Sequence, residues 1–243
     1  MKMLTFAKRC TKEILRDPIN LGFGLGFPIV LLVLLSAIQA NVPLPMFEIH
    51  TLTPGITVFG LSFMTLFSAT LIAKDRETAF LQRLYTTPLT GFDFILGYML
   101  PLLPIAVGQT LICYLFAIPL GLTVSTNILY AIVGIIPMAV FNIALGLLCG
   151  SLLSVKQVGG LCGALLTNLS AWLSGVWFDP ELVGGLFAKT ANALPFFHAV
   201  ELEKTLFCRD FEDAAPHILP ILLYSVIITV VAVLCFLRQM KKQ

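Results

Sequence analysis

The longest uncharged stretch of this sequence limits what the chain can fold into. After Asp93 the next charged residue is Lys156, which leaves 62 consecutive positions without Asp, Glu, Lys or Arg. A helix that crosses the hydrocarbon core of a bilayer needs about 20 predominantly apolar residues. Soluble domains have about 25% charged residues, whereas this chain has 12%, with a mean hydropathy of +0.96. The stretch therefore predicts two membrane-spanning helices.

Further charge-free stretches predict four more crossings. A break at the Gly- and hydroxyl-rich residues 121–127 divides the longest stretch in two. All of these runs are long and continuous, as in helices, and lack the short alternating pattern of a barrel. The six expected spans are 19–40, 51–73, 94–119, 128–153, 158–178 and 217–237. The expected fold class is an all-α polytopic membrane protein, with residues 1–243 forming a single transmembrane domain.

The positions of Lys and Arg predict the orientation of these helices. Twelve of the 15 fall in segments that six crossings would place on one side, and three fall in the long segment 179–216. Because Lys and Arg are concentrated in cytoplasmic loops, we expect both termini to be cytoplasmic and 179–216 to be extracellular. This outer segment has apolar stretches, which predict short re-entrant or interfacial helices.

Two predicted cytoplasmic segments are amphipathic. Residues 1–18 have an apolar face and a cationic one, which is typical of a helix in the inner headgroup layer, apolar side down and cations toward anionic lipid. Residues 74–92, between the second and third spans, predict a helix from about 75 to 86 that ends before Pro88. A simple connection needs only a few residues. The second segment is therefore either a docking element or an interfacial helix without a partner.

The sequence KDRETAFLQRLYTTPLTGFDFILGYML, residues 74–100, resembles the signature of type-2 ATP-binding-cassette (ABC) permeases. Two other segments resemble the same family in the same order, LRDPIN at 15–20 and LSGVWFDPELVGGLFAKTANALPFFHAVE at 173–201. The matching positions of the first segment are Arg76, Glu77, Thr78, Leu81, Arg83, Leu84, Thr87, Pro88 and Gly97. The resemblance covers nearly the whole chain and agrees with the six spans counted independently.

This resemblance implies a half-size, six-helix exporter subunit in the cell membrane of a prokaryote. It implies that residues 74–92 form the coupling helix, which sits in a cleft of a cytoplasmic ATPase. It also implies the partners: a dimer of ABC ATPases, a second permease chain that is identical or homologous, and membrane lipid. The expected ATPase-docking residues are Arg76, Glu77, Phe80, Leu81, Arg83, Leu84, Tyr85 and Pro88.

The sequence has no motif for ATP hydrolysis or metal binding. No G-x-x-x-x-G-K-[ST], H-E-x-x-H or G-x-S-x-G occurs. We therefore expect no cofactor or metal on this chain and no enzymatic activity of its own, with ATP and Mg²⁺ bound by the partner ATPase. The six cysteines have no paired spacing, and His50, His198 and His217 are far apart in the sequence. A net charge of +2 does not indicate nucleic acid.

Polar residues within the expected spans are few and uncharged. This argues against an ion-driven carrier and favours hydrophobic or amphipathic cargo. Polar candidates for the translocation path are Asn20, Gln109, Asn142 and Asn168. Small-residue pairs that allow close helix approach, within the chain or at a dimer seam, are Gly22 with Gly26, Gly146 with Gly150, and Gly159 with Gly163.

The leading hypothesis is the membrane subunit of an ATP-driven exporter for a drug, antibiotic, peptide or lipid-like molecule. Export of a lipid-linked polysaccharide is an alternative within the same family. A membrane-embedded lipid enzyme and a non-transporting immunity or sensor protein are alternatives from other classes, and neither needs a docking segment. An acid cluster in the outer segment is expected to be a solvated face: Glu201, Glu203, Asp210, Glu212 and Asp213.

Overall fold

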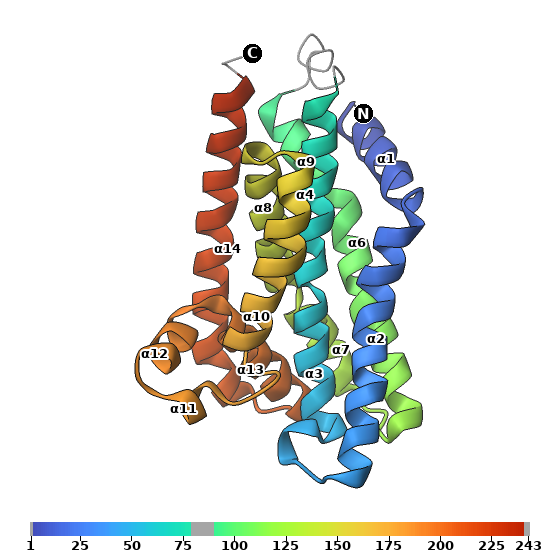
Figure 1. Cartoon of the computed structure of the whole chain (residues 1–243), viewed down its shortest axis with the longest axis vertical. Coiled ribbons are helices and arrows are strands. Elements are labelled where there is room, and N and C mark those ends of the chain that lie inside the picture. The colour runs from blue at the N-terminus through green and yellow to red at the C-terminus, as the bar shows by residue number, and fades with distance from the viewer. Residues whose placement is uncertain (1, 79–89, 241–243) are drawn as a thin grey trace.

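A computed structural model of the protein describes residues 2–78 and 90–240, and within these ranges it contains helices and no strands. The expected all-α fold is confirmed. Figure 1 shows the longest helices running along one axis. The first and last described residues lie at the same end of this bundle, which we call the termini end, and a group of short helices lies toward the opposite end (Figure 1).

Five helical stretches are long and apolar enough to cross a membrane, and each overlaps one predicted span. They are α2 (Pro18–Asn41), α3 with α4 (Ile49–Gly60 and Ser62–Glu77), α6 with η2 (Gly91–Ala117 and Ile118–Leu120), α7 with α8 (Asn127–Gly134 and Ile136–Leu152) and α14 (Phe211–Met240). The chain is therefore a polytopic membrane protein by the length and composition of its helices.

The predicted span 158–178 is not among these five stretches. It falls on three successive short helices, α9 (Val155–Val158), the π-helix η3 (Gly159–Leu166) and α10 (Thr167–Leu173). The π segment reads GGLCGALL, and glycine weakens the preference for α-helical geometry. The side chain of Thr167 also donates to the carbonyl of Cys162, five residues earlier, at 3.0 Å. Six crossings therefore stay a prediction.

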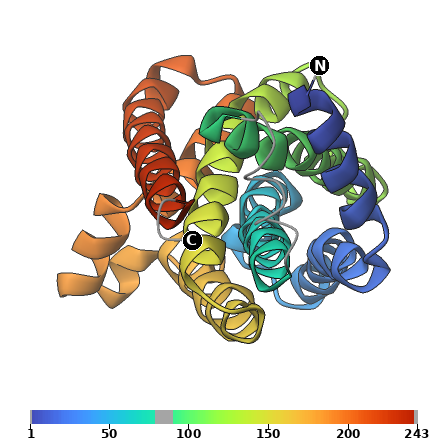
Figure 2. The same cartoon turned by 90° about the horizontal axis from the view of Figure 1, so that it is seen from above.

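The pair α3 and α4 forms the centre of the bundle. In its apolar window 89% of residues are buried, against 17% for the α14 window. Figure 2 shows α3 and α4 (cyan) enclosed by their neighbours, with α14 (red) at the rim. The difference indicates that the α3–α4 pair is enclosed by the rest of the chain, whereas most of the α14 surface lies on the outside of the bundle.

Small residues bring α4 and α8 into close contact. The hydroxyl of Thr65 lies 3.0 Å from the main-chain oxygen of Asn142, and the hydroxyl of Ser68 donates to the carbonyl of Ile143 at 2.9 Å. A methyl group at Gly146 would collide with the main-chain oxygen of Thr65, and one at Gly150 with that of Ala69. Packing and interhelical hydrogen bonds of this kind hold helices together in lipid.

The other predicted glycine pairs do not pack in this way. A methyl group at Gly22, Gly26 or Gly159 would meet no atom of the described residues within 4 Å, and one at Gly163 would meet only Leu66, at 3.5 Å. A packing role for these four positions within the described chain is therefore not seen.

The N-terminal helix α1 (Lys2–Leu15) differs from the expectation in one respect. Its apolar stripe does not face lipid, because it packs on α6. The ring of Phe6 meets Phe94 and Tyr98 edge to face, with centroids 5.6 and 4.9 Å apart. Burial raises the pKa of the Cys10 thiol, on the same face, to about 12, so this cysteine is an inert packing residue. An amphipathic pattern cannot distinguish lipid from an apolar protein surface, because both exclude water.

The segment 179–216 contains the predicted short helices, α11 (Pro180–Val183), α12 (Gly185–Ala193) and α13 (Pro195–Cys208). Helix α13 packs against α3, α7 and α14, which buries part of the expected acid cluster. Glu203 is only 1% exposed, so its assignment to a solvated face is wrong. An apolar stripe of Ala199, Val200 and Phe207 surrounds it on the same helix face, and turns this face inward.

Two of the three histidines, distant in sequence, meet in the structure. The Nδ1 atoms of His198 on α13 and His217 on α14 are 2.9 Å apart, and Nε2 of His198 lies 2.9 Å from the carbonyl oxygen of Asn192. His50 instead packs against Phe207, with ring centroids 6.0 Å apart. Within residues 2–78 and 90–240, no group of three or more His, Cys, Asp or Glu side chains could hold a metal ion.

The contact between α4 and α8 makes a prediction. Gly146→Ala should lower the free energy of unfolding by about 1 to 3 kcal/mol, because the methyl group forces two packed backbones apart. Gly22→Ala is the matched control and should not lower the free energy of unfolding, since the added methyl meets open space and alanine favours a helix. Thermal unfolding in mild detergent checks both. Equal effects of the two substitutions would contradict the contact.

Candidate functional site

Four consecutive charged residues, Lys74 to Glu77, end helix α4 at the termini end of the bundle, and each contacts a different part of the chain. We call them the Lys74–Glu77 anchor. Lys74 forms an ion pair with Asp17, the residue that caps the start of α2, with Nζ 3.2 Å from Oδ2. Both side chains of this pair are partly exposed, so the pair contributes little to stability.

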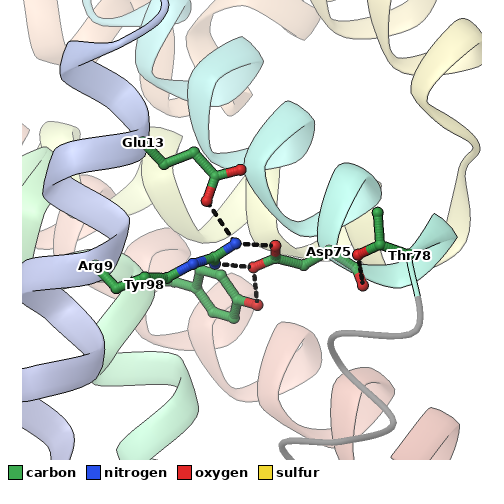
Figure 3. Close-up of polar contacts among 5 residues, drawn as sticks. All are labelled: Arg9, Glu13, Asp75, Thr78 and Tyr98. Carbon is green, nitrogen blue, oxygen red and sulfur yellow. Dashed lines mark hydrogen bonds and ion pairs between the residues drawn. The ribbon is translucent and has the colours of Figure 1, made fainter.

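Asp75 joins α4 to both α1 and α6. The Arg9 guanidinium donates to both of its carboxylate oxygens, at 2.5 and 2.6 Å, and the Tyr98 hydroxyl donates to Oδ2 at 2.8 Å (Figure 3). Asp75 is 1% exposed. A bidentate arginine and a further hydroxyl donor are what a buried carboxylate needs to be stable.

Arg9 also serves a second carboxylate. Its Nη2 atom lies 2.6 Å from Oε2 of Glu13, one turn along α1, and Figure 3 shows the guanidinium between the two acids. Burial raises the pKa of Glu13, and so does the nearby charge of Asp75. One guanidinium therefore holds two acids of different elements together.

The last two residues of the anchor bind helix ends. Nη1 of Arg76 donates to the carbonyls of Gly150 and Leu153, at 2.9 and 3.2 Å, where α8 ends. The carboxylate of Glu77 accepts from the main-chain N–H of Val155 at 2.9 Å, where α9 begins. A cation at a helix C-terminus and an anion at an N-terminus each complement the helix dipole and satisfy orphan backbone groups.

The far side of the predicted coupling segment is also held. Thr90 and Asp93 form a capping box at the start of α6, with the Thr90 main-chain N–H donating to the Asp93 carboxylate at 2.9 Å. Residues 79–89 lie outside the described residues. They include six of the expected docking positions: Phe80, Leu81, Arg83, Leu84, Tyr85 and Pro88. The docking assignment of all eight residues stays a prediction, with Arg76 and Glu77 also bound within the chain.

The four polar residues predicted for the translocation path lie in different surroundings. Asn20 binds the Asp17 carboxylate at 2.8 Å and belongs to the cap of α2. Gln109 is buried against Gly60, and Asn142 is buried at the contact of α4 with α8. Asn168 is exposed and donates to the carbonyl of Ala164 at 2.7 Å. Asn168 lines a groove, and Asn20 lines a small hollow beside Asp17 and Lys74.

That groove is lined mainly by aromatic side chains. It has a volume of about 370 Å³ and lies between α2, the α3–α4 pair and the η3–α10 stretch. Edge contacts order its wall, with ring centroids 5.9 Å apart for Phe27 and Phe63 and 6.1 Å for Phe59 and Trp177. We call it the aromatic groove, and it is lined by Phe23, Phe27, Phe59, Phe63, Gly163, Thr167, Asn168, Ala171, Trp172 and Trp177.

A second buried acid lies far from the anchor. The Tyr114 hydroxyl on α6 donates to Oε1 of Glu203 on α13 at 3.1 Å, and the Tyr114 ring stacks on Phe207 at 5.9 Å. Burial raises the pKa of the Glu203 carboxyl well above its usual value. Burial therefore favours the protonated form of this acid.

Sequence reasoning missed the Asp75 and Glu203 pairings for different reasons. Asp75 stands in a run of charges that predicts a solvated segment, and its partners are 66 and 23 positions away. Glu203 did have a signal, because residues 199, 200, 203 and 207 share the face of one helix. Three of these four residues are apolar, which predicts burial of the whole face.

The sequence was compared with protein-family models and with curated proteins. A family model described as ABC-2 type transporter matches residues 1–203. The chain belongs to the ABC-2 type transporter family. No curated protein matches it.

The matched range includes the Lys74–Glu77 anchor and the aromatic groove, and it ends within α13. An ABC-2 membrane domain is the permease part of an ABC transporter and has no ATP site of its own. Membership implies an ABC ATPase as the partner. The resemblance stated from the sequence is thereby confirmed at the level of the family.

The anchor generates a prediction. Asp75→Asn should lower the free energy of unfolding by about 2 to 3 kcal/mol, since it leaves Arg9 without its main partner at a buried site. Lys74→Gln is the matched control and should cost less than about 1 kcal/mol, because its ion pair is exposed. Thermal unfolding of the permease alone measures both. Equal losses in the free energy of unfolding for the two variants would show that the buried Asp75 contributes no more to stability than the exposed Lys74.

The raised pKa of the Glu203 carboxyl leads to a prediction about pH. Above pH 4.5, the ordinary pKa of a glutamate carboxyl, the unfolded chain releases a proton that the folded chain keeps, so folding loses stability as the pH rises. Glu203→Gln has no such proton. The thermal unfolding midpoint of this variant, compared with that of wild type at the same pH, should therefore increase as the pH is raised from about 5 to about 8.

Thermal unfolding in detergent at a series of pH values checks this. Glu203→Ala is the control and should unfold at a lower temperature throughout, because it leaves the Tyr114 hydroxyl without an acceptor and creates a cavity. A midpoint difference between Glu203→Gln and wild type that is independent of pH would contradict a protonated carboxyl.

Proposed function

We propose that this chain is the permease subunit of an ATP-driven exporter that moves a hydrophobic or amphipathic molecule out of the cell. The observation that carries the proposal is the Lys74–Glu77 anchor in a member of the ABC-2 family. A force on the segment after Glu77 acts at once on five helices: α1, α2, α6, α8 and α9. A connection to several helices at once is what a permease needs if ATP hydrolysis in a partner protein is to move its membrane helices.

The docking argument follows from how the coupling segment is held. Asp75 is buried and charge-paired near the start of the segment, and Thr90 and Asp93 cap α6 at its end. A segment fixed at both sides can transmit a movement of its partner instead of absorbing it. Phe80, Leu84 and Tyr85 are proposed as the apolar plug in the ATPase cleft, and the partner supplies ATP and Mg²⁺.

The aromatic groove supports the proposed class of cargo. None of its lining residues is charged, so it offers little to an ion. Trp172 is half exposed, and Asn168 and Thr167 are the polar side chains of the lining. Such a surface suits a flat or elongated apolar molecule with one or two polar groups. The cargo is proposed to be a drug, antibiotic, peptide or lipid-like molecule.

The alternatives fit the structure less well. Aromatic surfaces also stack on sugars, so a lipid-linked polysaccharide stays the second candidate within the family. A lipid enzyme would need its acids together at an interface, and instead Glu203 is buried with Tyr114 while Glu201 pairs with Lys204 at 2.8 Å. A passive sensor has no use for an anchored coupling segment.

The complete assembly is proposed to contain two permease chains and two ATPases in the cell membrane of a prokaryote. The sixth crossing is proposed to be the helical stretch from α9 to α10, with the termini end of the bundle in the cytoplasm. The second permease chain is proposed to be identical or homologous to this one.

The experiment is co-purification with the ATPase encoded beside this gene. The permease carries the tag, and vanadate-sensitive ATP hydrolysis is measured in mild detergent. We expect a stoichiometric ATPase with wild type, and loss of both association and activity with Leu84→Asp, which places a charge in an apolar cleft. Leu84→Met is the matched control and should keep both, because it conserves volume and apolarity.

Hydrophobic compounds and a lipid-linked sugar are then tested for stimulation of hydrolysis. Stimulation by the sugar alone would select the polysaccharide alternative. Full ATPase association with Leu84→Asp would reject the docking assignment, and substrate turnover that survives inactivation of the ATPase would reject the transporter.

A further inference from the structure

The exposed face of α1 carries a line of cations. Lys8 and Lys12 on α1, and Arg16 directly after its end, follow one another at intervals of four residues, which places them on one side. All three are exposed, and no acid of the described ranges forms an ion pair with them. Their neighbours Arg9 and Glu13 turn toward α4 and are engaged with Asp75 and with each other. We call Lys8, Lys12 and Arg16 the cationic face.

Exposed apolar side chains flank this face, and their contact with water would be unfavourable. Leu4 and Leu15 are exposed beside the cations, Leu15 by 62%. The chain then enters α2, whose outer surface exposes Ile19 by 71% and also Phe23. Such a surface on the outside of a membrane bundle contacts hydrocarbon. The cationic face thus lies where the lipid-facing surface begins, at the level of the headgroups.

The face also has room for a ligand. A surface hollow is lined by Thr5, Lys8, Arg9, Lys12, Glu13 and Arg16. Its one acid, Glu13, is paired with Arg9, with atoms 2.6 Å apart. The other charged groups of the hollow are the exposed cations Lys8, Lys12 and Arg16. Headgroup phosphates accept hydrogen bonds from such groups and complement their charge.

We propose that Lys8, Lys12 and Arg16 bind the headgroup phosphates of anionic phospholipids in the adjoining leaflet. The apolar flanks favour a lipid over an acidic protein, because a headgroup brings acyl chains that cover Leu15 and Ile19. Arg9, which lies beside this face on the same helix, holds Asp75. Anionic lipid at this face therefore holds α1 from outside while the Lys74–Glu77 anchor holds it from inside. The proposal does not depend on transport or on an ATPase.

The test uses the full-length permease, purified alone. Native mass spectrometry compares retention of phosphatidylglycerol with that of phosphatidylcholine, which differ in headgroup charge. Wild type should prefer the anionic lipid, and Lys12→Gln with Arg16→Gln should reduce the preference about five-fold for each cation removed. The matched control, Lys156→Gln with Arg238→Gln, removes two other exposed cations and should keep it. Thermal unfolding verifies that both variants are folded.

Two further measurements test the same proposal. The wild-type preference should weaken as ionic strength rises, because salt screens charges at an exposed surface, and the single variant Lys8→Gln should lose part of it. Equal retention of the two lipids by wild type, or equal losses in both double variants, would overturn the proposal. A third outcome has two parts: wild type shows no lipid preference, and the double variant Lys12→Gln with Arg16→Gln fails to bind the ATPase. This outcome would identify the cationic face as a protein-docking surface instead.

Discussion

A carboxylate enclosed by helices is costly unless charged and hydrogen-bonding partners meet it, and Asp75 is met by Arg9 of α1 and Tyr98 of α6. The last turn of α4 takes its position from this contact. Arg76 and Glu77 can bind the ends of α8 and α9 because Asp75 fixes the turn that carries them. The coupling segment starts from the same turn, so the proposed link between ATPase and membrane helices depends on one buried charge.

The rest of α4 connects this last turn to the centre of the bundle. Toward the centre, glycines and hydroxyl side chains let α8 approach the α4 backbone directly. A helix packed this closely moves with its neighbour. The aromatic groove lies on another side of the α3–α4 pair and is closed by the η3–α10 stretch, whose π-helical geometry departs from the regular spacing. Such π segments occur frequently at functional sites in helices. The anchor, the central pair and the groove are therefore continuous.

The two buried acids lie in different surroundings. Asp75 accepts hydrogen bonds from the Arg9 guanidinium and the Tyr98 hydroxyl. Glu203 meets the Tyr114 hydroxyl and apolar side chains, and burial favours its protonated form. The first joins elements that the proposed function needs to move together. The second holds α13 against α6.

The sequence alone determined that the chain is helical and membrane-spanning, because charge-free runs of this length have no other stable solution in lipid. It also determined the family, through the residues around 74–100, and the presence of short helices in 179–216. Only the tertiary structure decided which side of α1 meets protein, which glycines are in contact, and that Asp75 and Glu203 are buried. The reason is that periodicity describes one helix at a time, whereas each of these features depends on residues that distant parts of the chain bring to the same place.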